Sequence, residues 1–583
     1  MFIDRIQKVL DKSLSELYPH LDLKPKLEYP SSQTYGDLTT NIALSLGSKL
    51  NQSPREIASE IVEKINQDKL ITDNIENISI EGPGFINFYL KDSSLWESAL
   101  IHLLSKSTHQ NNPGKGKKVI VEFSSPNIAK PFNVGHLRST IIGDSIARLY
   151  EYLGYQVIRD NHLGDWGTQY GKLAYAVDNW GDWEKIEKNP IRELFDLYVR
   201  FHREEGENPQ LSEAGREYFK KLEHKDPRVL KTWEKLVDLS IEDFNKLYER
   251  LGVRFDIQLG ESYYEPMLAG VIEECKSKGI ARESNGALLI FFDDVPELKE
   301  YPLMIVKSNG TSTYGTRDLA GVKYRFNKYK IDKLIIEIGN EQQLYFKQII
   351  KASEMMGWVD PGQLVHIGHG LFMLPTGKMS TRKGETVWVS ELIDELEIRA
   401  RSILSERKDL YHDEIEAIVN DVAIGALKYN DLSQNRLGNV VFDKEKSLAL
   451  DGNSAPYLQY TIARSASVLR KYGLEVSSTV NIDKIKDVAN NRQDMLEESE
   501  REILALLTRF DKIVEQSAET YLPSTLASYL FSVAQKYNSF YQSNSILNSD
   551  SPIKESRILI VHITQHVLSK GLELLGINSP SRM

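Results

Sequence analysis

A short apolar run at residues 119–121 leads into a turn rich in proline, asparagine and glycine, and the turn opens a helical pattern. The run VIV predicts a buried strand, and apolar residues between Leu137 and Leu153 recur at three- and four-residue spacing. A strand, a tight turn and a helix in this order present backbone N–H groups to a phosphate in α/β folds. This stretch therefore predicts an α/β nucleotide-binding fold.

The turn ends in Asn-Val-Gly-His at 133–136, within the longer string SSPNIAKPFNVGHLRST at 124–140 and ahead of LGDWGTQYGKL at 163–173. The last four residues resemble the ATP-binding His-x-Gly-His element of class I aminoacyl-tRNA synthetases. The longer strings resemble the arginyl-tRNA synthetase family in particular. The resemblance implies that ATP, with Mg²⁺, activates L-arginine to arginyl-adenylate. It also implies transfer to the 2′-hydroxyl of the terminal adenosine of tRNA(Arg).

A second element, GKMSTRKG at 377–384, resembles the mobile KMSKS loop of the same class. Negative charge builds on the α-phosphate and on departing pyrophosphate, so cations are needed there. Lys378, Arg382 and Lys383 between two glycines would supply them, whereas a basic turn in solvent is the alternative interpretation. The resemblance assigns catalysis to Lys378, Ser380 and Arg382, and ATP binding to Lys378, Met379 and Ser380.

The remaining nucleotide-site residues follow from the first element. The resemblance assigns ATP binding to Asn133, Gly135, His136 and Met373, with His136 also catalytic. Thr381 stands where the KMSKS loop has its second lysine. Lys130 could supply that cation and is therefore a catalytic candidate, although it could equally be a lysine exposed to solvent.

Residues 366–369 also spell His-Ile-Gly-His, the literal signature of the class. They end an apolar segment and run into GLFM, without a phosphate-binding turn that opens a helix. We therefore predict that His366 and His369 are not the motif histidines.

Arginine recognition should depend on acidic groups, because a planar guanidinium matches a carboxylate in bidentate geometry. Asp318 and Glu122 fall where the family binds the arginine substrate. Ser125, Asn127 and Gln342 fall where it binds the α-amino and carboxylate groups, and Tyr314 would form a wall of the side-chain pocket. Two alternatives remain open: Asp318 could pair with a basic side chain of the protein, and Glu122 could cap a turn.

The chain is too long for one core, and its patterns predict three domains. The prediction is a small α/β N-terminal domain (1–110), a Rossmann-type catalytic domain (115–405) and an all-α C-terminal bundle (410–583). A helix-rich insertion, at about 185–300, would separate two halves of the catalytic domain. The second half is predicted to resume with residues 302–306 and to contain a buried strand at 334–338.

Both end domains resemble tRNA-binding domains of the family. Phe85 and Asn87 fall where its N-terminal domain places a stacking aromatic and a polar base contact at the D-loop corner, although Phe85 could also belong to a core. In the C-terminal bundle, the residues that fall on the anticodon-contacting surface are Tyr457, Tyr460, Asn538, Tyr541 and Met583.

Composition sets weaker limits. The net charge of −11 argues mildly against a nucleic-acid partner, although clustering of Lys and Arg matters more than their sum. Cys275 is the only cysteine, which excludes intrachain disulfides and Cys-rich metal sites and fits a reducing cytosol. No apolar run has the length of a membrane helix, and no membrane role is expected. We expect a cytoplasmic monomer without a metal site built by the protein.

Two other functions remain open. A non-catalytic tRNA-binding paralogue is disfavoured by Lys378, Ser380 and His136. A related ligase for a different small acid would have no use for the helical C-terminal third. A P-loop NTPase is unsupported, because no Gly-x-x-x-x-Gly-Lys-Ser/Thr element occurs.

Overall fold

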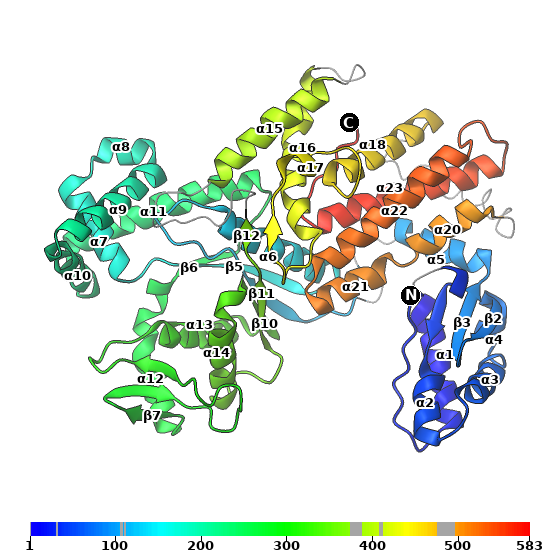
Figure 1. The fold of residues 1–583 in the computed structure, drawn as a ribbon, viewed down its shortest axis with the longest axis horizontal. Coiled ribbons are helices and arrows are strands. Elements are labelled where there is room, and N and C mark those ends of the chain that lie inside the picture. The colour runs from blue at the N-terminus through cyan, green and yellow to red at the C-terminus, as the bar shows by residue number, and fades with distance from the viewer. Residues whose placement is uncertain are drawn as a thin grey trace.

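The computed structural model describes residues 2–30, 33–104, 109, 112–373, 388–406, 412–474 and 496–583. Figure 1 shows the N-terminal unit at one end of the molecule and a group of helices, α7 to α10, at the other. The central sheet lies between them, and the C-terminal bundle extends above the N-terminal unit in this view. Lys378, Met379, Ser380 and Arg382 lie outside the described residues.

The N-terminal unit packs the helices α1 to α4 against a small antiparallel sheet in the order β1-β3-β2. Ser53 is the N-cap of α3 and Pro54 its first residue, and the Ser53 side chain makes no capping hydrogen bond. The bounds are α1 (Phe2–Leu17), β1 (Leu38–Thr40), α2 (Ile42–Leu50), α3 (Pro54–Ile65), α4 (Lys69–Asn74), β2 (Ile75–Glu81) and β3 (Phe85–Leu90), with α5 (Asp92–Leu104) leading out of the unit.

The central sheet is parallel, with the strand order β11-β10-β4-β5-β6. β4 and β10 are neighbours in the sheet, but the chain continues from them toward opposite edges. This arrangement is a topological switch point, and α/β sheets bind ligands in the crevice at the carboxyl ends of such strands. The bounds are β4 (Lys118–Glu122), β5 (Gln156–Leu163), β6 (Ile257–Gly260), β10 (Lys333–Gly339) and β11 (Leu364–His369).

Helices between β5 and β6 form the far end of the molecule (Figure 1). Their own apolar faces pack together, away from the central sheet, in two small clusters. The bounds are α7 (Thr168–Trp180), α8 (Trp183–Lys188), α9 (Pro190–Glu207), α10 (Gln210–Glu223) and α11 (Pro227–Arg250).

The structure differs from the predicted insertion of about 185–300 in its detail. β6 lies within that range yet belongs to the central sheet. After the 3₁₀ segment η2 (Glu261–Met267) and α12 (Leu268–Ser277), the strands β7 (Ala281–Ser284), β8 (Ala287–Ile290) and β9 (Leu303–Val306) form a separate antiparallel sheet. The predicted start of the second half at 302–306 thus forms β9 of this separate sheet and not a strand of the central one. A short apolar run reads the same in either kind of sheet.

The second half of the catalytic fold continues through α13 (Tyr314–Tyr329), the 3₁₀ turn η3 (Asn340–Gln342) and α14 (Gln343–Met355). A short parallel pair, β12 (Phe372–Met373) with β13 (Val440–Val441), then joins this part to the C-terminal bundle. The bundle contains α15 (Val389–Ser405), α16 (His412–Leu432), α17 (Lys444–Ser447), α18 (Ala455–Tyr472), α20 (Glu498–Leu507), α21 (Phe510–Thr520), α22 (Pro523–Ser543) and α23 (Ile553–Leu574).

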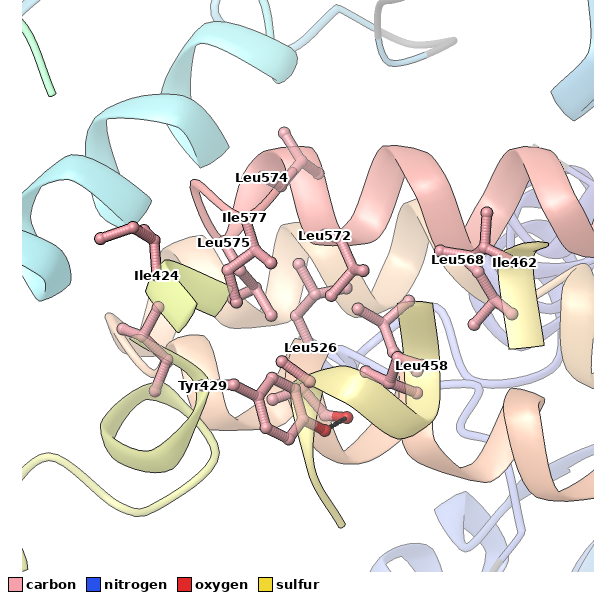
Figure 2. Packing of buried hydrophobic residues seen from close by; sticks show 14 of the residues in the cluster. Ile424, Tyr429, Leu458, Ile462, Leu526, Leu568, Leu572, Leu574, Leu575 and Ile577 are labelled. Carbon is pink, nitrogen blue, oxygen red and sulfur yellow. Dashed lines mark hydrogen bonds between the residues drawn. The ribbon is translucent and has the colours of Figure 1, made fainter. Parts of the chain in front are cut away.

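The helix α6 (Val134–Tyr152) joins the catalytic sheet to the bundle. Its apolar residues belong to one core with β4 on one side and with α16, α21, α22 and α23 on the other. Figure 2 shows part of this core, in which Leu572 and Leu575 pack near Leu526 and Ile424. The buried Arg138 on α6 donates to Asp431 on α16 and to the carbonyls of Leu371, Arg436 and Gly438.

Candidate active site

The turn before α6 ends in a capped helix start. Asn133 is the N-cap, and its Oδ1 accepts hydrogen bonds from the backbone N–H of Gly135 (2.9 Å) and His136 (3.3 Å). A Cβ at Gly135 would lie 3.1 Å from that oxygen, so glycine also makes room for the cap. Asn133, which replaces the expected histidine, therefore orders the helix start through its acceptor oxygen.

His136 is held as a neutral hydrogen-bond donor. Burial, reinforced by the positive charge of Lys130, lowers the pKa of His136 to about 4. Its Nδ1 accepts a hydrogen bond from the backbone N–H of Asn133 (3.3 Å). A neutral imidazole carries one proton, so in this tautomer Nε2–H is the donor available to a phosphate.

Lys130 lies near this turn but is not simply a solvated lysine. Its Nζ donates to Oε1 of Gln169 (2.9 Å) and lies 5.2 Å from the centre of the Tyr198 ring. These contacts hold a cation close enough to His136 to lower its pKa.

The loop between β4 and α6 carries backbone strain. Ser124, Ser125 and Ala129 have φ values of 74°, 47° and 56°, in the left-handed region. Each such residue costs about 1–3 kcal/mol, and surrounding contacts must hold it there. Here Oγ of Ser139 accepts from the Ser124 N–H (3.0 Å) and Oδ1 of Asn161 accepts from the Ser125 N–H (3.1 Å).

A cavity of about 370 Å³ opens at the carboxyl ends of β4, β5 and β10, at the switch point of the sheet. The six residues predicted to bind arginine all line it: Glu122, Ser125, Asn127, Tyr314, Asp318 and Gln342. The residues that the sequence reasoning missed are His162, Gly164, Glu261, Ile338, Tyr345 and Phe346. The cavity thus combines residues from both halves of the catalytic fold.

Two carboxylates of this cavity have pKa values raised above the ordinary range. Burial raises the pKa of Asp318 to about 6, although the Tyr345 hydroxyl donates a hydrogen bond to its Oδ2. Burial and the negative charge of Asp318 raise the pKa of Glu261 to about 8. Among the described residues, the buried Oε2 of Glu261 has no hydrogen-bond partner. A buried polar atom of this kind is costly unless a ligand satisfies it.

Glu122 differs from these two because the protein already supplies its cation. Oε2 of Glu122 lies 2.7 Å from Nη2 of Arg325, whose Nε donates to Oδ2 of Asp160 (2.6 Å). Burial raises the pKa of Glu122 against the pull of Arg325. The sequence left open that Asp318 pairs with a basic side chain of the protein. In the structure it is Glu122 that forms such a pair, with Arg325.

The other lining residues are Asn127, held by hydrogen bonds, and Tyr314 and Gln342, each at the end of an element. Oδ1 of Asn127 accepts from the Tyr170 hydroxyl (3.2 Å) and from Nε2 of Gln169 (3.4 Å). Tyr314 begins α13 at the rim and is 57% exposed. Gln342 ends η3, directly after β10.

The ends of the predicted KMSKS-like segment are described, although the segment itself is not. Met373 on β12 is partly buried and pairs with Val441 on β13. Trp388 forms an antiparallel bridge with Asn133, and the N–H of Val389 donates to the carbonyl of Phe132 (3.2 Å). The first described residues after the segment, Trp388 and Val389, therefore lie beside the turn that holds His136.

His366 and His369 lie on β11 and do not open a helix. His366 stacks on Phe346 with 4.9 Å between ring centres, and Nδ1 of His369 lies 2.7 Å from Oε1 of Glu337. Burial opposes the charged form of His369, but Glu337 outweighs it and raises the pKa of this imidazole. Both rings thus have structural partners outside the turn before α6.

A second cavity, of about 610 Å³, lies between α18, the end of α22 and the C-terminus; we call it the base cavity. Three predicted tRNA-contacting residues, Tyr460, Tyr541 and Met583, line it. Arg464, which the sequence reasoning missed, lies between the Tyr460 and Tyr541 rings, with its Cζ 4.8 Å and 5.3 Å from their centres.

The two remaining predicted residues of the bundle, Asn538 and Tyr457, form a hydrogen-bonded chain with Arg464. Nη1 of Arg464 donates to Oδ1 of Asn538 (2.8 Å), and Nδ2 of Asn538 donates to the Tyr457 hydroxyl (2.9 Å). Aromatic rings and an arginine guanidinium offer flat faces on which unpaired nucleotide bases can stack. The hydrogen bonds through Asn538 hold the guanidinium of Arg464 in place.

The N-terminal prediction is divided by burial. Phe85 is 39% exposed at the start of β3, so it is available to stack on a base. Asn87 is 2% exposed, and its Oδ1 accepts from the Thr39 hydroxyl (2.7 Å). The structure therefore disfavours a direct base contact for Asn87, because the side chain is already used between β1 and β3.

Comparison with known protein families shows the class of enzyme to which the catalytic part belongs. The family model described as tRNA synthetases class I (R), catalytic domain, matches residues 99–444. Models of the arginyl tRNA synthetase N terminal domain and the DALR anticodon binding domain match residues 4–90 and 458–583. The catalytic part is thus that of a class I tRNA synthetase, and the chain belongs to the arginyl-tRNA synthetase family.

Similar proteins agree over the full length. "Arginine--tRNA ligase" of Fusobacterium nucleatum is 37% identical, covering 99% of this chain and 98% of its own, and that of Clostridium acetobutylicum is 36% identical, covering 100% and 99%. An arginyl-tRNA synthetase structure from Plasmodium falciparum has a TM-score of 0.83 at 26% identity, covering 100% of this chain and 99% of its own. One from Thermus thermophilus reaches 0.85 at 24% identity, with full coverage of both chains. These matches confirm the predicted fold class.

Proposed function

We propose that this chain is an arginine–tRNA ligase, which activates L-arginine with ATP and transfers it to tRNA(Arg). One observation carries the proposal: the partly buried carboxylates of Asp318 and Glu261 meet in a cavity lined by the loop that leads to His136. A guanidinium is a planar cation with several N–H donors, so two carboxylates can satisfy it together.

In the first step, the arginine carboxylate attacks the ATP α-phosphate in line, and arginyl-adenylate and pyrophosphate form. We assign ATP to the turn of Asn133, Gly135 and His136, where His136 donates Nε2–H to the phosphates. Lys130 supplies a cation, and Lys378 and Arg382 of the KMSKS-like loop supply two more. Ser380 of the same loop is assigned to ATP. Met373 and Met379 are assigned to the nucleotide. No protein nucleophile is required, so positioning and charge stabilisation account for the rate.

The cavity then orients the amino acid for both steps. Ser125, Asn127 and Gln342 are assigned to the α-amino and carboxylate groups, with Asp318 and Glu261 on the guanidinium. In the second step, the 2′-hydroxyl of the terminal adenosine attacks the activated carbonyl and AMP leaves. Tyr314, exposed at the rim, is assigned to the side-chain wall, next to the path of that adenosine.

The partners follow from the same proposal. tRNA(Arg) is assigned to the base cavity of the bundle and to Phe85 of the N-terminal unit. Mg²⁺ is assigned to ATP as the counter-ion of its phosphates. Within the described ranges, no group of three His, Cys, Asp or Glu side chains could hold a metal ion. No helix there is long and apolar enough to cross a membrane. We retain a cytoplasmic monomer as a proposal.

Pyrophosphate exchange tests the proposal against the non-catalytic alternative. With arginine, ATP, Mg²⁺ and tRNA, the protein should exchange labelled pyrophosphate into ATP. The family resemblance implies that this exchange depends on tRNA, so omission of tRNA should abolish it. Binding of tRNA without exchange in either condition would favour a non-catalytic tRNA-binding protein.

The pKa values predict that arginine binding releases a proton. Near neutral pH, Asp318 (pKa about 6) is mostly ionised and Glu261 (pKa about 8) is mostly protonated. A cation favours the ionised carboxylates, so affinity should rise with pH through both values and level off above about 8. One released proton corresponds to about tenfold in affinity per pH unit.

Calorimetry of arginine binding in two buffers with different ionisation enthalpies would measure this proton. Glu261→Gln should remove the pH dependence between about 7 and about 8 and retain the dependence near 6. Binding without proton release in the unaltered protein would contradict the assignment of Glu261 to the guanidinium.

A further inference from the structure

A buried carboxylate lies behind the cavity of about 370 Å³ that is proposed for arginine, which we call the arginine cavity. Asp165 comes two residues after β5 and is 3% exposed, but it does not line the cavity. Its neighbour Gly164 lines it, and so does Glu261, which follows β6. Because β5 and β6 are adjacent parallel strands, Asp165 and Glu261 leave the same edge of the sheet side by side.

Both carboxylate oxygens of Asp165 accept hydrogen bonds from the residue that follows Glu261. The backbone N–H of Ser262 donates to Oδ1 (2.9 Å), and the Ser262 hydroxyl donates to Oδ2 (2.6 Å). Hydrogen bonds to an ionised acceptor are about twice as strong as those between neutral groups. Asp165 therefore holds the chain firmly on the far side of Glu261.

Asp165 also contacts the chain on the near side of Glu261. A Cβ at Gly260 would collide with Oδ2 and Cγ of Asp165. Gly260 has a φ of −83°, which any residue can adopt. It is thus the contact with Asp165, and not the backbone conformation, that requires a glycine here. The turn 260–262 is held by Asp165 on both sides of Glu261.

Asp165 is itself held in place by two other parts of the fold. Nε1 of Trp233 on α11 donates to the Asp165 carbonyl (2.8 Å). The Gly164 N–H donates to the Pro126 carbonyl (3.1 Å), and the Ile128 N–H donates to the Gly164 carbonyl (3.0 Å). These bonds join Asp165 to the insertion helices and to the loop between β4 and α6. A residue that positions a site needs such support of its own.

Glu261 depends on this turn because the protein leaves part of its carboxylate unbonded. Its buried Oε2 has no hydrogen-bond partner among the described residues. The charged groups around Glu261 are Asp165, Glu265, Arg317 and Asp318. Three tyrosine hydroxyls also lie near it, those of Tyr170, Tyr314 and Tyr345, and burial raises the pKa of each. None of these tyrosines therefore ionises near pH 8.

We propose that Asp165 is a positioning residue for arginine: it holds the turn 260–262 so that the Glu261 carboxylate meets the guanidinium of the bound amino acid. The proposal rests on the proposed function, because it needs arginine in this cavity. Asp165 acts through Glu261 and not by contact with the substrate, since it does not line the cavity. A displacement of about 1 Å in a positioned group can cost about 10²-fold, so loss of this support should be measurable.

The test measures arginine binding by calorimetry in the full-length protein. Asp165→Ala should raise the Kd for arginine at least about tenfold, because the turn loses both hydrogen bonds and the contact at Gly260. The Kd for a non-hydrolysable ATP analogue should stay within about twofold, since Asp165 is far in the fold from the cap of α6. Ser262→Ala removes one of the two bonds and is the milder variant if Asp165→Ala fails to fold. It should weaken arginine binding in the same direction, by about threefold.

Asp165→Asn separates positioning from a purely structural role. Its amide oxygen can still accept from the Ser262 N–H, and its NH₂ can donate to the Ser262 hydroxyl, so affinity above pH 8 should recover to within about threefold. The negative charge of Asp165 is one of the causes that raise the pKa of Glu261 to about 8. The asparagine removes that charge and lowers this pKa, so arginine affinity should level off at a lower pH than in the unaltered protein.

Asp256→Ala is the matched control. Oδ2 of Asp256 accepts from the Arg159 N–H (2.8 Å) and so also joins β5 to β6, but at the start of β6 and away from the arginine cavity. This variant should leave the Kd for arginine within about twofold. An equal loss in Asp256→Ala and Asp165→Ala, or a pH profile of Asp165→Asn identical to that of the unaltered protein, would overturn the proposal.

The unaltered protein separates this proposal from the proposed function. Normal arginine binding in the unaltered protein, in Asp165→Ala and in Ser262→Ala would reject only the role of Asp165. Absence of arginine binding in the unaltered protein would reject the proposed function as well.

Discussion

Asp318→Asn should lower kcat/KM for arginine by about 10²–10³-fold, which corresponds to about 3–4 kcal/mol. The substitution keeps the size of the side chain but replaces a buried acceptor with an amide whose NH₂ would face the guanidinium donors. Loss of one partner of a buried charge pair leaves the other charge unpaired, which is the main cost. The KM for ATP should change little, because Asp318 is assigned no phosphate contact.

Steady-state pyrophosphate exchange in the presence of tRNA would measure both constants. Asp360→Asn is a suitable control, because this exposed aspartate precedes β11 and does not line the arginine cavity. Glu261→Gln should show a loss in the same direction as Asp318→Asn. A variant at Asp318 that activates arginine normally would remove this residue from the site.

His136→Ala should lower the rate of adenylate formation by about 10²–10³-fold, as loss of a single transition-state donor does. The neutral imidazole donates through Nε2, and alanine cannot replace that hydrogen bond. Arginine binding should be nearly unchanged, because His136 does not line the arginine cavity. The variant also loses the acceptor for the Asn133 N–H, so its free energy of unfolding should fall by about 1 kcal/mol.

Rapid-quench measurement of adenylate in a single turnover isolates this step from tRNA charging. The control is the double variant His366→Gln, His369→Gln, which alters the literal signature and leaves the turn before α6 intact. Its loss of rate should be clearly smaller. A larger loss in the control than in His136→Ala would mean that the wrong element has been assigned to the phosphates.

The sequence predicted those parts of the structure that are continuous in the chain. The strand, turn and helix around His136 carry their own signals in spacing and turn residues, and they form as predicted. The six residues expected to bind arginine come from recognisable strings, and all line one cavity. Their roles in binding remain proposals.

The parts that were missed depend on contacts between distant segments. Glu261 lies in a short 3₁₀ segment without periodicity, and only the packing of η2 against α13 brings it next to Asp318. The pairing of Glu122 with Arg325 joins a strand end to a helix from the other half of the fold. The burial of Asn87 and the position of Arg464 between two tyrosines likewise depend on side-chain packing, which a residue pattern does not specify.

Aminoacylation with each amino acid in turn tests the central proposal most directly. The purified protein is given ATP, Mg²⁺, bulk tRNA and one labelled amino acid at a time, and acid-precipitable label is counted. Arginine should be charged in preference to lysine by about 10⁴-fold or more, because an ammonium leaves the carboxylates of a cavity built for a planar fork incompletely paired. Preferential charging of any amino acid other than arginine, or of none, would contradict the proposed function.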